Sequence, residues 1–220
     1  MIQLENVSKI YHTKYGNIKA LDKVNLYVNK GEFVVIRGPS GCGKTTLLLS
    51  IGGMLKPTEG KIFISGKNIY DINSRERARF RAENIGFVFQ LFHLVPYLNV
   101  VENVLLPAGS VKKKYGRTEA ERLLKNFELS DRMLHKTTEL STGEKQRTAI
   151  ARALFNHPSI ILADEPTGNL DPENADKIVK YLEEFHKDGG TVVVVTHGKK
   201  VDQYADRVIY MRKGKFEKLQ

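Results

Sequence analysis

The segment that decides the fold spans eight residues and reads Gly38-Pro39-Ser40-Gly41-Cys42-Gly43-Lys44-Thr45. Its spacing is that of a phosphate-binding loop, in which a glycine and four further residues precede Gly-Lys-Ser/Thr. The run Phe33–Arg37 before it has strand character, and leucines at helical spacing follow it as far as Gly52-Gly53. A strand, this loop and a helix in that order favour phosphate binding over a glycine-rich turn that matches by chance.

The chemistry of the loop follows from its glycines and from the helix behind it. Glycines let backbone N–H groups converge on phosphate oxygens, and the helix start adds the positive end of its dipole. Lys44 would reach the β- and γ-phosphates, and the Thr45 hydroxyl would bind Mg²⁺. The thiol of Cys42, the only cysteine, would face the ligand, so that its alkylation blocks nucleotide binding; a small filling residue is the alternative.

Two acids end a second apolar strand. Ile160-Ile161-Leu162-Ala163 delivers Asp164 and Glu165 to its carboxyl end, which is the edge where open parallel sheets bind ligands. Asp164 would then be a partner of Mg²⁺, directly or indirectly, and Glu165 would orient or deprotonate an attacking water. The alternative is that the pair is only the solvated end of a strand.

Two more polar residues follow predicted strands, and a third precedes a predicted helix. Gln90 ends the run Ile85–Phe89 and offers an amide that could bind Mg²⁺ or hold water. His197 ends the run Thr191–Thr196, where its imidazole could contact a γ-phosphate. Asp171 precedes Pro172 and fits the N-cap of a helix, a structural role that leaves room for another.

A second helix start is predicted in the segment Leu140-Ser141-Thr142-Gly143-Glu144-Lys145-Gln146-Arg147. Ser141 and Glu144 have the spacing of a capping box, so a well-capped helix is one interpretation. The chain, however, already contains one phosphate-binding helix start, about 100 residues earlier. A second one suggests a nucleotide held between two subunits.

Composition and charge narrow the class of protein. The 220 residues are 41% hydrophobic and 27% charged, which excludes a disordered or collagen-like chain and predicts one or two domains. No apolar run approaches the roughly 18 to 20 residues of a membrane-spanning helix, and the start does not resemble a secretory signal. One cysteine permits no intrachain disulfide and favours a reducing, cytosolic compartment. The net charge of +10 favours an anionic partner or simply maintains solubility, and the run Lys112–Lys114 is more readily a solvated loop.

The order of patterns along the chain predicts an α/β core interrupted by a helical segment. Short strands are expected at 2–7, 24–28 and 33–37, with residues 29–32 as a hairpin turn between the last two. Helical spacing dominates residues 99–154, where Leu123, Leu124 and Phe127 share one face. Apolar strands then alternate with helices, including Pro172–Lys187, and a β-ribbon ends the chain.

In this order the motifs resemble the nucleotide-binding subunits of ABC transporters, over essentially the whole chain. The resemblance implies a Walker A loop at residues 38–45, a Q-loop at Gln90, a signature at residues 140–146, a D-loop at Asp171 and a switch histidine at His197. It implies Walker B at Asp164, the catalytic glutamate at Glu165, and an adenine-stacking ring at Tyr11. The residues expected to contact ATP are Tyr11, Gly38, Pro39, Ser40, Gly41, Cys42, Gly43, Lys44, Thr45, Thr46, Ser141, Gly143, Glu144 and Asp171.

Residues 86–96, 99–104 and 163–171 are similar to one branch of this family, which holds lipoprotein-releasing, macrolide-exporting and cell-division ATPases. The resemblance implies a single ABC ATPase domain over residues 1–220. Residues 1–89 and 156–220 would form an α/β P-loop NTPase (RecA-like) core with an N-terminal antiparallel β subdomain, and residues 90–155 an inserted helical subdomain. A homodimer around MgATP would power a separate membrane permease from the inner, cytoplasmic face of the membrane.

In such a dimer each site would take Lys44, Thr45, Gln90, Glu165 and His197 from one chain, and Ser141 and Gly143 from the other. The permease would dock in a groove near residues 90–107, where five apolar residues suit either docking or internal packing: Leu91, Phe92, Leu94, Val95 and Tyr97. Two other functions stay open. One is a non-transporting regulator like the cell-division member, and the other is a nucleic-acid-linked ATPase, although no nucleic-acid partner is expected.

The sequence departs from the family pattern at three positions, one of which is the common variant Glu144 in place of the signature's usual glutamine. Thr142 replaces the usual first glycine of the signature, where it would cost backbone freedom if that position needs φ > 0, or crowd the opposing nucleotide. Gly198 follows the switch histidine, where an acid is usual, and would loosen that turn. We therefore expect reduced ATPase activity.

Overall fold

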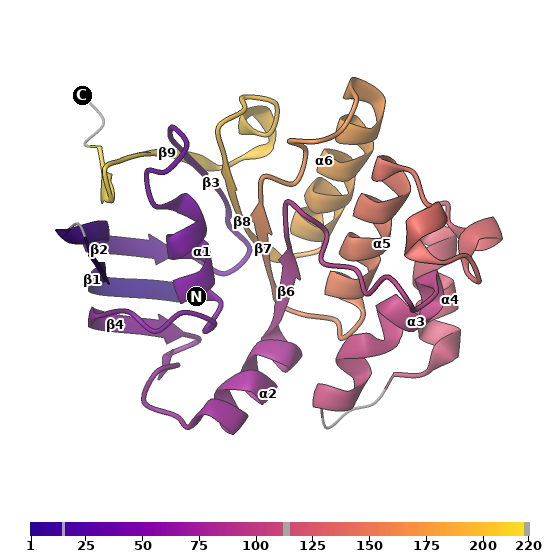
Figure 1. Ribbon diagram of the computed structural model, residues 1–220, viewed down its shortest axis with the longest axis horizontal. Helices are drawn as coiled ribbons and strands as arrows, with labels where there is room; N and C mark the ends of the chain where they lie inside the picture. Colours follow the sequence, from indigo (N-terminus) through magenta and orange to yellow (C-terminus); the bar gives the residue numbers. More distant parts are fainter. Residues whose placement is uncertain (15, 112–114, 218–220) are drawn as a thin grey trace.

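The computed structural model describes the chain except for residues 15, 112–114 and 218–220, and its elements form two sheets with helices around them (Figure 1). The lysine run at 112–114 therefore lies outside the described residues. Among the described residues, no helix combines the length and the apolar character that a membrane span requires.

The larger sheet has six strands and carries the strands that end in polar residues. Its order is β10 (Lys215–Phe216), β9 (Arg207–Arg212), β3 (Phe33–Arg37), β8 (Thr191–Thr196), β7 (Ile160–Asp164) and β6 (Ile85–Val88). All neighbours are parallel except β10 and β9, which form the expected ribbon. Every residue of β6, β7 and β8 is buried, as continuous apolar runs predict for a parallel sheet covered on both faces.

The smaller sheet is antiparallel, in the order β2 (Gly16–Val28), β1 (Ile2–Thr13), β4 (Glu59–Ile64) and β5 (Lys67–Asn68). The predicted hairpin at residues 29–32 is wrong, because β2 belongs to this sheet and β3 to the other. The turn itself is tight, with the Asn29 N–H donating to Glu32 Oε2 at 2.6 Å. It passes the chain from one sheet to the next because β3 is almost wholly buried and needs covered, parallel neighbours.

Two hydrophobic cores meet along β3. Val34 and Ile36 pack into a core between the two sheets, around helix α1 (Lys44–Ile51). Phe33 and Val35 pack into the core on the other side of the large sheet. Successive residues of a strand point to opposite faces, so one five-residue strand joins both cores and ends at the glycine loop.

The second core is covered by helices α3 (Val100–Leu105), α4 (Arg117–Asn126), α5 (Thr142–Leu154) and α6 (Pro172–Lys187). Leu123, Leu124 and Phe127 lie in it, which confirms their predicted common face. Short 3₁₀ helices complete the segment and the C-terminal part: Leu106–Ser110, Ser130–Arg132, Thr137–Glu139 and Asp202–Tyr204. The described residues between 99 and 154 contain no strand, as expected, and only one isolated bridge, between Asn99 and Lys136.

Helix α2 (Ser74–Asn84) is absent from the sequence-based expectation. It has no fully buried residue, so no apolar stripe announces it. Its start is fixed locally, because Asn73 accepts the N–H of Glu76 at 2.9 Å.

Candidate functional site

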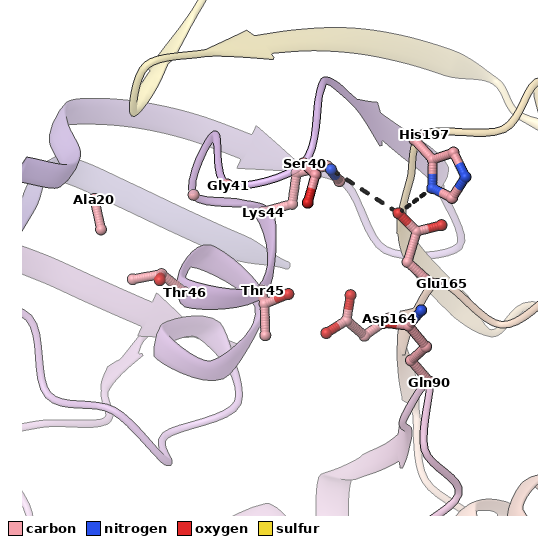
Figure 2. A pocket seen from close by; sticks show the side chains of 11 residues that line it. Ala20, Ser40, Gly41, Lys44, Thr45, Thr46, Gln90, Asp164, Glu165 and His197 are labelled. Carbon is pink, nitrogen blue, oxygen red and sulfur yellow. Dashed lines mark hydrogen bonds and ion pairs between the residues drawn. The ribbon is translucent and has the colours of Figure 1, made fainter. Parts of the chain in front are cut away.

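A cavity of about 420 Å³ lies where the carboxyl ends of β3, β6, β7 and β8 meet the start of α1 (Figure 2). It brings together ten of the residues predicted from the sequence: Ser40, Gly41, Gly43, Lys44, Thr45, Thr46, Gln90, Asp164, Glu165 and His197. Ala20 of β2 also lines it and was not predicted. Four strand ends at one edge agree with the ligand position of open α/β sheets.

The glycine loop is shaped by close backbone contacts. Gly41 and Gly43 have φ of 74° and 109°, in the left-handed region that favours glycine. A Cβ on Gly43 would lie 2.2 Å from the Ala20 carbonyl oxygen, and one on Gly38 would lie 2.1 Å from that of Met211. The loop is therefore wedged between β2 and β9. No local signal marks Ala20, because its place depends on this contact between distant segments.

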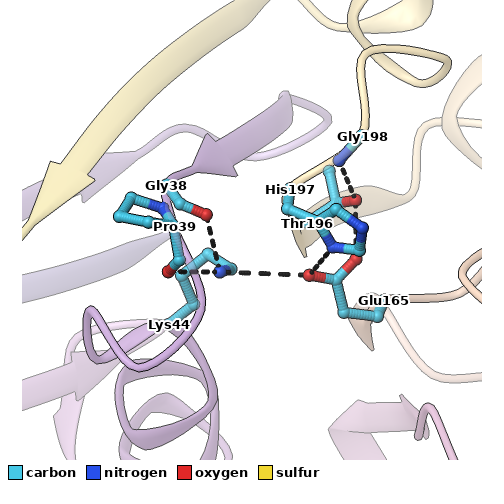
Figure 3. Close-up of polar contacts among 7 residues, drawn as sticks. All are labelled: Gly38, Pro39, Lys44, Glu165, Thr196, His197 and Gly198. Atoms are coloured by element: carbon cyan, nitrogen blue, oxygen red, sulfur yellow. Dashed lines mark hydrogen bonds and ion pairs between the residues drawn. The ribbon is translucent and has the colours of Figure 1, made fainter.

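Lys44 points its ammonium group across the cavity toward Glu165 (Figure 3). Its Nζ donates to the carbonyl oxygens of Gly38 and Pro39, at 2.8 and 3.1 Å. The same nitrogen lies 3.9 Å from Glu165 Oε1, and the Lys44 side chain is only 7% exposed. A cation held this way sits ready for the phosphate oxygens of a bound nucleotide.

Glu165 is the centre of a hydrogen-bond network at the ends of β7 and β8 (Figure 3). Its Oε1 lies 2.8 Å from His197 Nδ1, and its Oε2 accepts from Thr196 Oγ1 at 2.8 Å. The Gly198 N–H donates to the same Thr196 oxygen at 3.0 Å, so this turn is fixed through the backbone. An ionised carboxylate only accepts, so Nδ1 of His197 carries the proton in this contact. Thr196 is a site residue that sequence reasoning missed, since a threonine that ends a strand has no distinctive spacing.

Asp164 is buried beside the start of α1. Burial raises its pKa; the hydrogen bond from Thr45 and the charge of Lys44 oppose the rise only in part, and Glu165 adds to it. A bound cation would favour the charged carboxylate. Thr45, Asp164 and Gln90 offer oxygen ligands, which suit Mg²⁺, while no group of three acids, histidines or cysteines among the described residues forms a metal cage. Mg²⁺ that keeps waters and binds substrate phosphates fits such a set.

The expectation that the Cys42 thiol faces the ligand is wrong. Its side chain is 5% exposed and packs in the core between the two sheets, instead of facing the ligand. The backbone of Cys42 turns inward with the loop, its N–H donating to the Pro39 carbonyl at 3.3 Å. The thiol therefore fills space, and alkylation is not expected to report on nucleotide binding.

The remaining predicted residues lie outside the cavity lining. Tyr11, on β1, is 39% exposed, and Lys9 Nζ lies 5.5 Å from the centre of its ring. Asp171 caps α6, since its Oδ1 accepts the Asn174 N–H at 3.0 Å. Ser141, Gly143 and Glu144 begin α5 in the helical segment.

The start of α5 is closed by its own side chains. Ser141 Oγ accepts the Glu144 N–H at 3.3 Å, and Glu144 Oε2 accepts the Ser141 N–H at 2.8 Å, which confirms the capping box. Burial alone would raise the pKa of Glu144, but hydrogen bonds from Ser141 and Arg132 outweigh it and lower that pKa. A Cβ on Gly143 would lie 2.4 Å from Asn174 Oδ1, so any larger residue there would have to displace the Asn174 side chain of α6.

Thr142 begins the helix, and it is not among the residues with positive φ. The expectation that it costs backbone freedom is therefore wrong, and only the possibility of crowding against an opposing nucleotide is left.

Comparison with known proteins decides the family. A family model described as "ABC transporter" matches residues 21–168. This chain belongs to the ABC transporter ATP-binding family. It is 46% identical to the uncharacterized ABC transporter ATP-binding protein MJ0796 of Methanocaldococcus jannaschii, over 99% of this chain and 96% of that protein. As a member of this family, the chain is an ATPase with an α/β P-loop NTPase fold.

Two other relatives come from the branch expected from the sequence. The lipoprotein-releasing system ATP-binding protein LolD of Porphyromonas gingivalis is 42% identical, over 97% of both chains. The macrolide export ATP-binding/permease protein MacB of Bdellovibrio bacteriovorus is 40% identical over 97% of this chain, which spans 33% of that longer protein.

A solved structure of MJ0796 aligns with a TM-score of 0.94 and 44% identity, covering 99% of this chain and 97% of that one. It is described as a dimeric post-hydrolysis state of an ATP-binding cassette bound to ADP and Pi.

Proposed function

We propose that two copies of this chain close head to tail around two MgATP molecules and that hydrolysis separates them, so that ATP turnover drives a membrane permease. The observation that carries the proposal is that the motifs fall into two groups. The loop, the acids and His197 line one cavity, whereas Ser141 and Gly143 lie outside its lining. A second chain supplies the missing wall, and the dimer of MJ0796 supports that arrangement.

In each site the residues have separate tasks. The glycine loop and Lys44 bind the phosphates, and Tyr11 stacks on the adenine. Glu165, oriented by Thr196 and by His197 Nδ1, holds the attacking water and accepts its proton. Protonated on both ring nitrogens, His197 donates from Nε2 to the γ-phosphate while Nδ1 stays on Glu165. Ser141 and Gly143 of the second chain cover the same phosphate. Mg²⁺, when bound to Thr45, Gln90 and Asp164, supplies positive charge to the phosphate oxygens.

Glu165→Gln tests the dimer. The amide still fits the network but accepts no proton, so hydrolysis stops and the ATP-bound state accumulates. We expect the variant with MgATP to sediment as a dimer, and as a monomer with MgADP. A Glu165→Gln/Ser141→Arg chain, whose added side chain blocks the opposing phosphate, is the control and should stay monomeric. If Glu165→Gln bound MgATP yet never paired, the composite site would be refuted.

The permease is proposed to dock in a groove of about 350 Å³ between α2, β6 and the end of α5. Phe89, His93, Pro107 and Met54 line this groove. The five apolar residues expected to form the docking surface do not line it; Leu91 and Tyr97 are 69% and 78% exposed. A chain that binds the permease through this groove would lie on the cytoplasmic face of the membrane without entering it. The relatives support an exporter or a lipoprotein, peptide or macrolide transporter.

Docking can be tested by cross-linking. Because Cys42 is buried, a photo-cross-linker attached to Met54→Cys reports on the groove alone. We expect an adduct with an integral membrane protein in the source cells. Leu134→Cys, also exposed but outside the groove lining, is the control. Equal adducts from both positions, or none from Met54→Cys, would contradict docking in the groove.

A further inference from the structure

The backbone after Gln90 is held in an unusual conformation. Phe92 and His93 have φ of 59° and 47°. Both values lie in the left-handed region, which is unfavourable for residues that carry a side chain. Two such residues in succession persist where surrounding contacts hold them in place.

Arg152, near the end of α5, makes such a contact. Its Nη2 donates to the Phe92 carbonyl oxygen and its Nη1 to the His93 carbonyl oxygen, both at 2.6 Å. In the described part of the chain no carboxylate pairs with this guanidinium, and burial lowers the pKa of Arg152. The planar fork of an arginine suits two neighbouring acceptors, so the two carbonyls offset the cost of burying this charge.

The same end of α5 is anchored to its surroundings. Asn156, two residues beyond the helix, donates from Nδ2 to the carbonyls of Ala82 and Pro107, both at 3.1 Å. A Cβ on Gly86 would lie 2.5 Å from the Ala153 carbonyl oxygen, so β6 and α5 are in close contact. β6 is the strand that leads to Gln90. These contacts hold the end of α5 in place next to β6. Arg152 therefore binds the segment that follows β6 from a fixed position.

We propose that Arg152 is a positioning residue for Gln90. By binding the carbonyls of Phe92 and His93 it fixes the direction in which the chain leaves β6, and therefore the place of the Gln90 amide at the cavity edge. This inference rests on the proposed function, in which Gln90 binds Mg²⁺. Since α5 starts at the Ser141 cap, Arg152 also joins the Gln90 of one ATP site to the residues that cover the other.

The test measures the hydrolysis of ATP by the purified full chain while Mg²⁺ is varied. It also measures, in a Glu165→Gln background without turnover, the Mg²⁺ dependence of ATP binding, which Arg152→Gln should weaken. Arg152→Gln should lower kcat about ten-fold and raise the Mg²⁺ concentration for half-maximal activity about ten-fold, the usual effect of losing a group that orients a metal ligand. Arg152→Lys, whose ammonium reaches one carbonyl, should fall between the parent and Arg152→Gln. Arg122→Gln is the control, because exposed Arg122 also makes two hydrogen bonds, to Glu119, and should change neither value.

A double-mutant cycle separates this role from a structural one. If Arg152 acts through Gln90, the Arg152→Gln/Gln90→Ala chain is no slower than Gln90→Ala alone. Additive losses would overturn the inference, as would an unchanged Mg²⁺ dependence in Arg152→Gln. A Gln90→Ala chain as active as the parent would instead refute the proposed role of Gln90. If Arg152→Gln does not fold, Phe92→Gly/His93→Gly loosens the same segment and must show the same non-additivity with Gln90→Ala.

Discussion

The helices α1 and α5 begin in opposite ways. The N-cap of α1 is Gly43, in a left-handed conformation, with no side-chain cap and no acid in the first turn. α5 begins with Ser141 and Glu144, which bond to each other's backbone N–H groups. Free helix N–H groups need partners. At the start of α1 no side chain caps the helix N–H groups, so a ligand can bind them. At the start of α5 the side chains of the capping box already do so.

Lys44→Ala should give the largest effect, because it removes the positive charge from the uncapped start. We expect ATP hydrolysis to fall at least about a hundred-fold, as for other lost groups that stabilise a developing charge, with the unfolding temperature nearly unchanged. The phosphate-release assay should include Lys180→Ala, an exposed lysine of α6, as the control. A Lys44→Ala chain that kept a tenth of the parent's activity would show that the backbone of the loop suffices.

Ser141→Ala removes the side-chain cap of α5. Stability should fall by about 1 kcal/mol, the usual cost of losing a serine cap, as measured by urea unfolding. Hydrolysis should fall as well if, as proposed, the same hydroxyl contacts the partner's ATP, while ATP binding by the monomer stays unchanged. Loss of stability with full activity would mean that Ser141 serves only its own helix.

The two helix starts should also differ in pH dependence. The pKa of Asp164 is raised in the folded state, so folding becomes less favourable as pH rises from the ordinary value of 3.8 through the folded value. Asp164→Asn should therefore unfold at a higher temperature than the parent at pH 7 without nucleotide, and at the same temperature below pH 3.8.

Glu144 should change folding stability with pH in the opposite direction. Its pKa is lowered, so its contribution is present above the ordinary value of 4.5 and is lost as pH falls through the folded value. Glu144→Gln should then lower the unfolding temperature at pH 7. Thermal scans of both variants at pH 3 to 8 check the pair, and equal signs at pH 7 would contradict this comparison.

Thr142→Gly should have the smallest effect. Thr142 has no positive φ, so glycine relieves no backbone strain and only removes a side chain from the surface that is proposed to face the partner's nucleotide. We expect hydrolysis in the assembled transporter to rise about two-fold, which corresponds to about 0.4 kcal/mol. Unchanged turnover would show that Thr142 does not crowd that site.

The sequence predicted those helices and turns that contacts between neighbouring residues determine. The helix Pro172–Lys187 follows from the Asp171 cap and the proline behind it, and the structure has it with the same bounds. Helix α2 escaped prediction because its stabilisation is a cap and partial burial, without an apolar stripe. The turn at 29–32 was recognised as a turn, but no local signal says which sheet the next strand enters.

The candidate site shows the same division. Its predicted members carry motif spacing, whereas Ala20, Thr196 and Arg152 gain their places only when distant segments meet. The direction of the Cys42 side chain depends on how the loop packs against β9. Gly38 lies between the two, because a Cβ on it would lie 2.1 Å from the Met211 carbonyl oxygen and 2.7 Å from Cys42 Sγ. Such contacts between distant segments have no sequence period to reveal them.

The carbonyls of Gly38 and Pro39 that hold the Lys44 ammonium have a thermodynamic consequence. The lysine's rotamers are restricted when the chain folds, so little side-chain freedom is left to lose when a nucleotide arrives. Triphosphate binding then exchanges one set of oxygen acceptors for a more negative one. Calorimetry should find an association that depends steeply on ionic strength, with a small entropy penalty from this side chain.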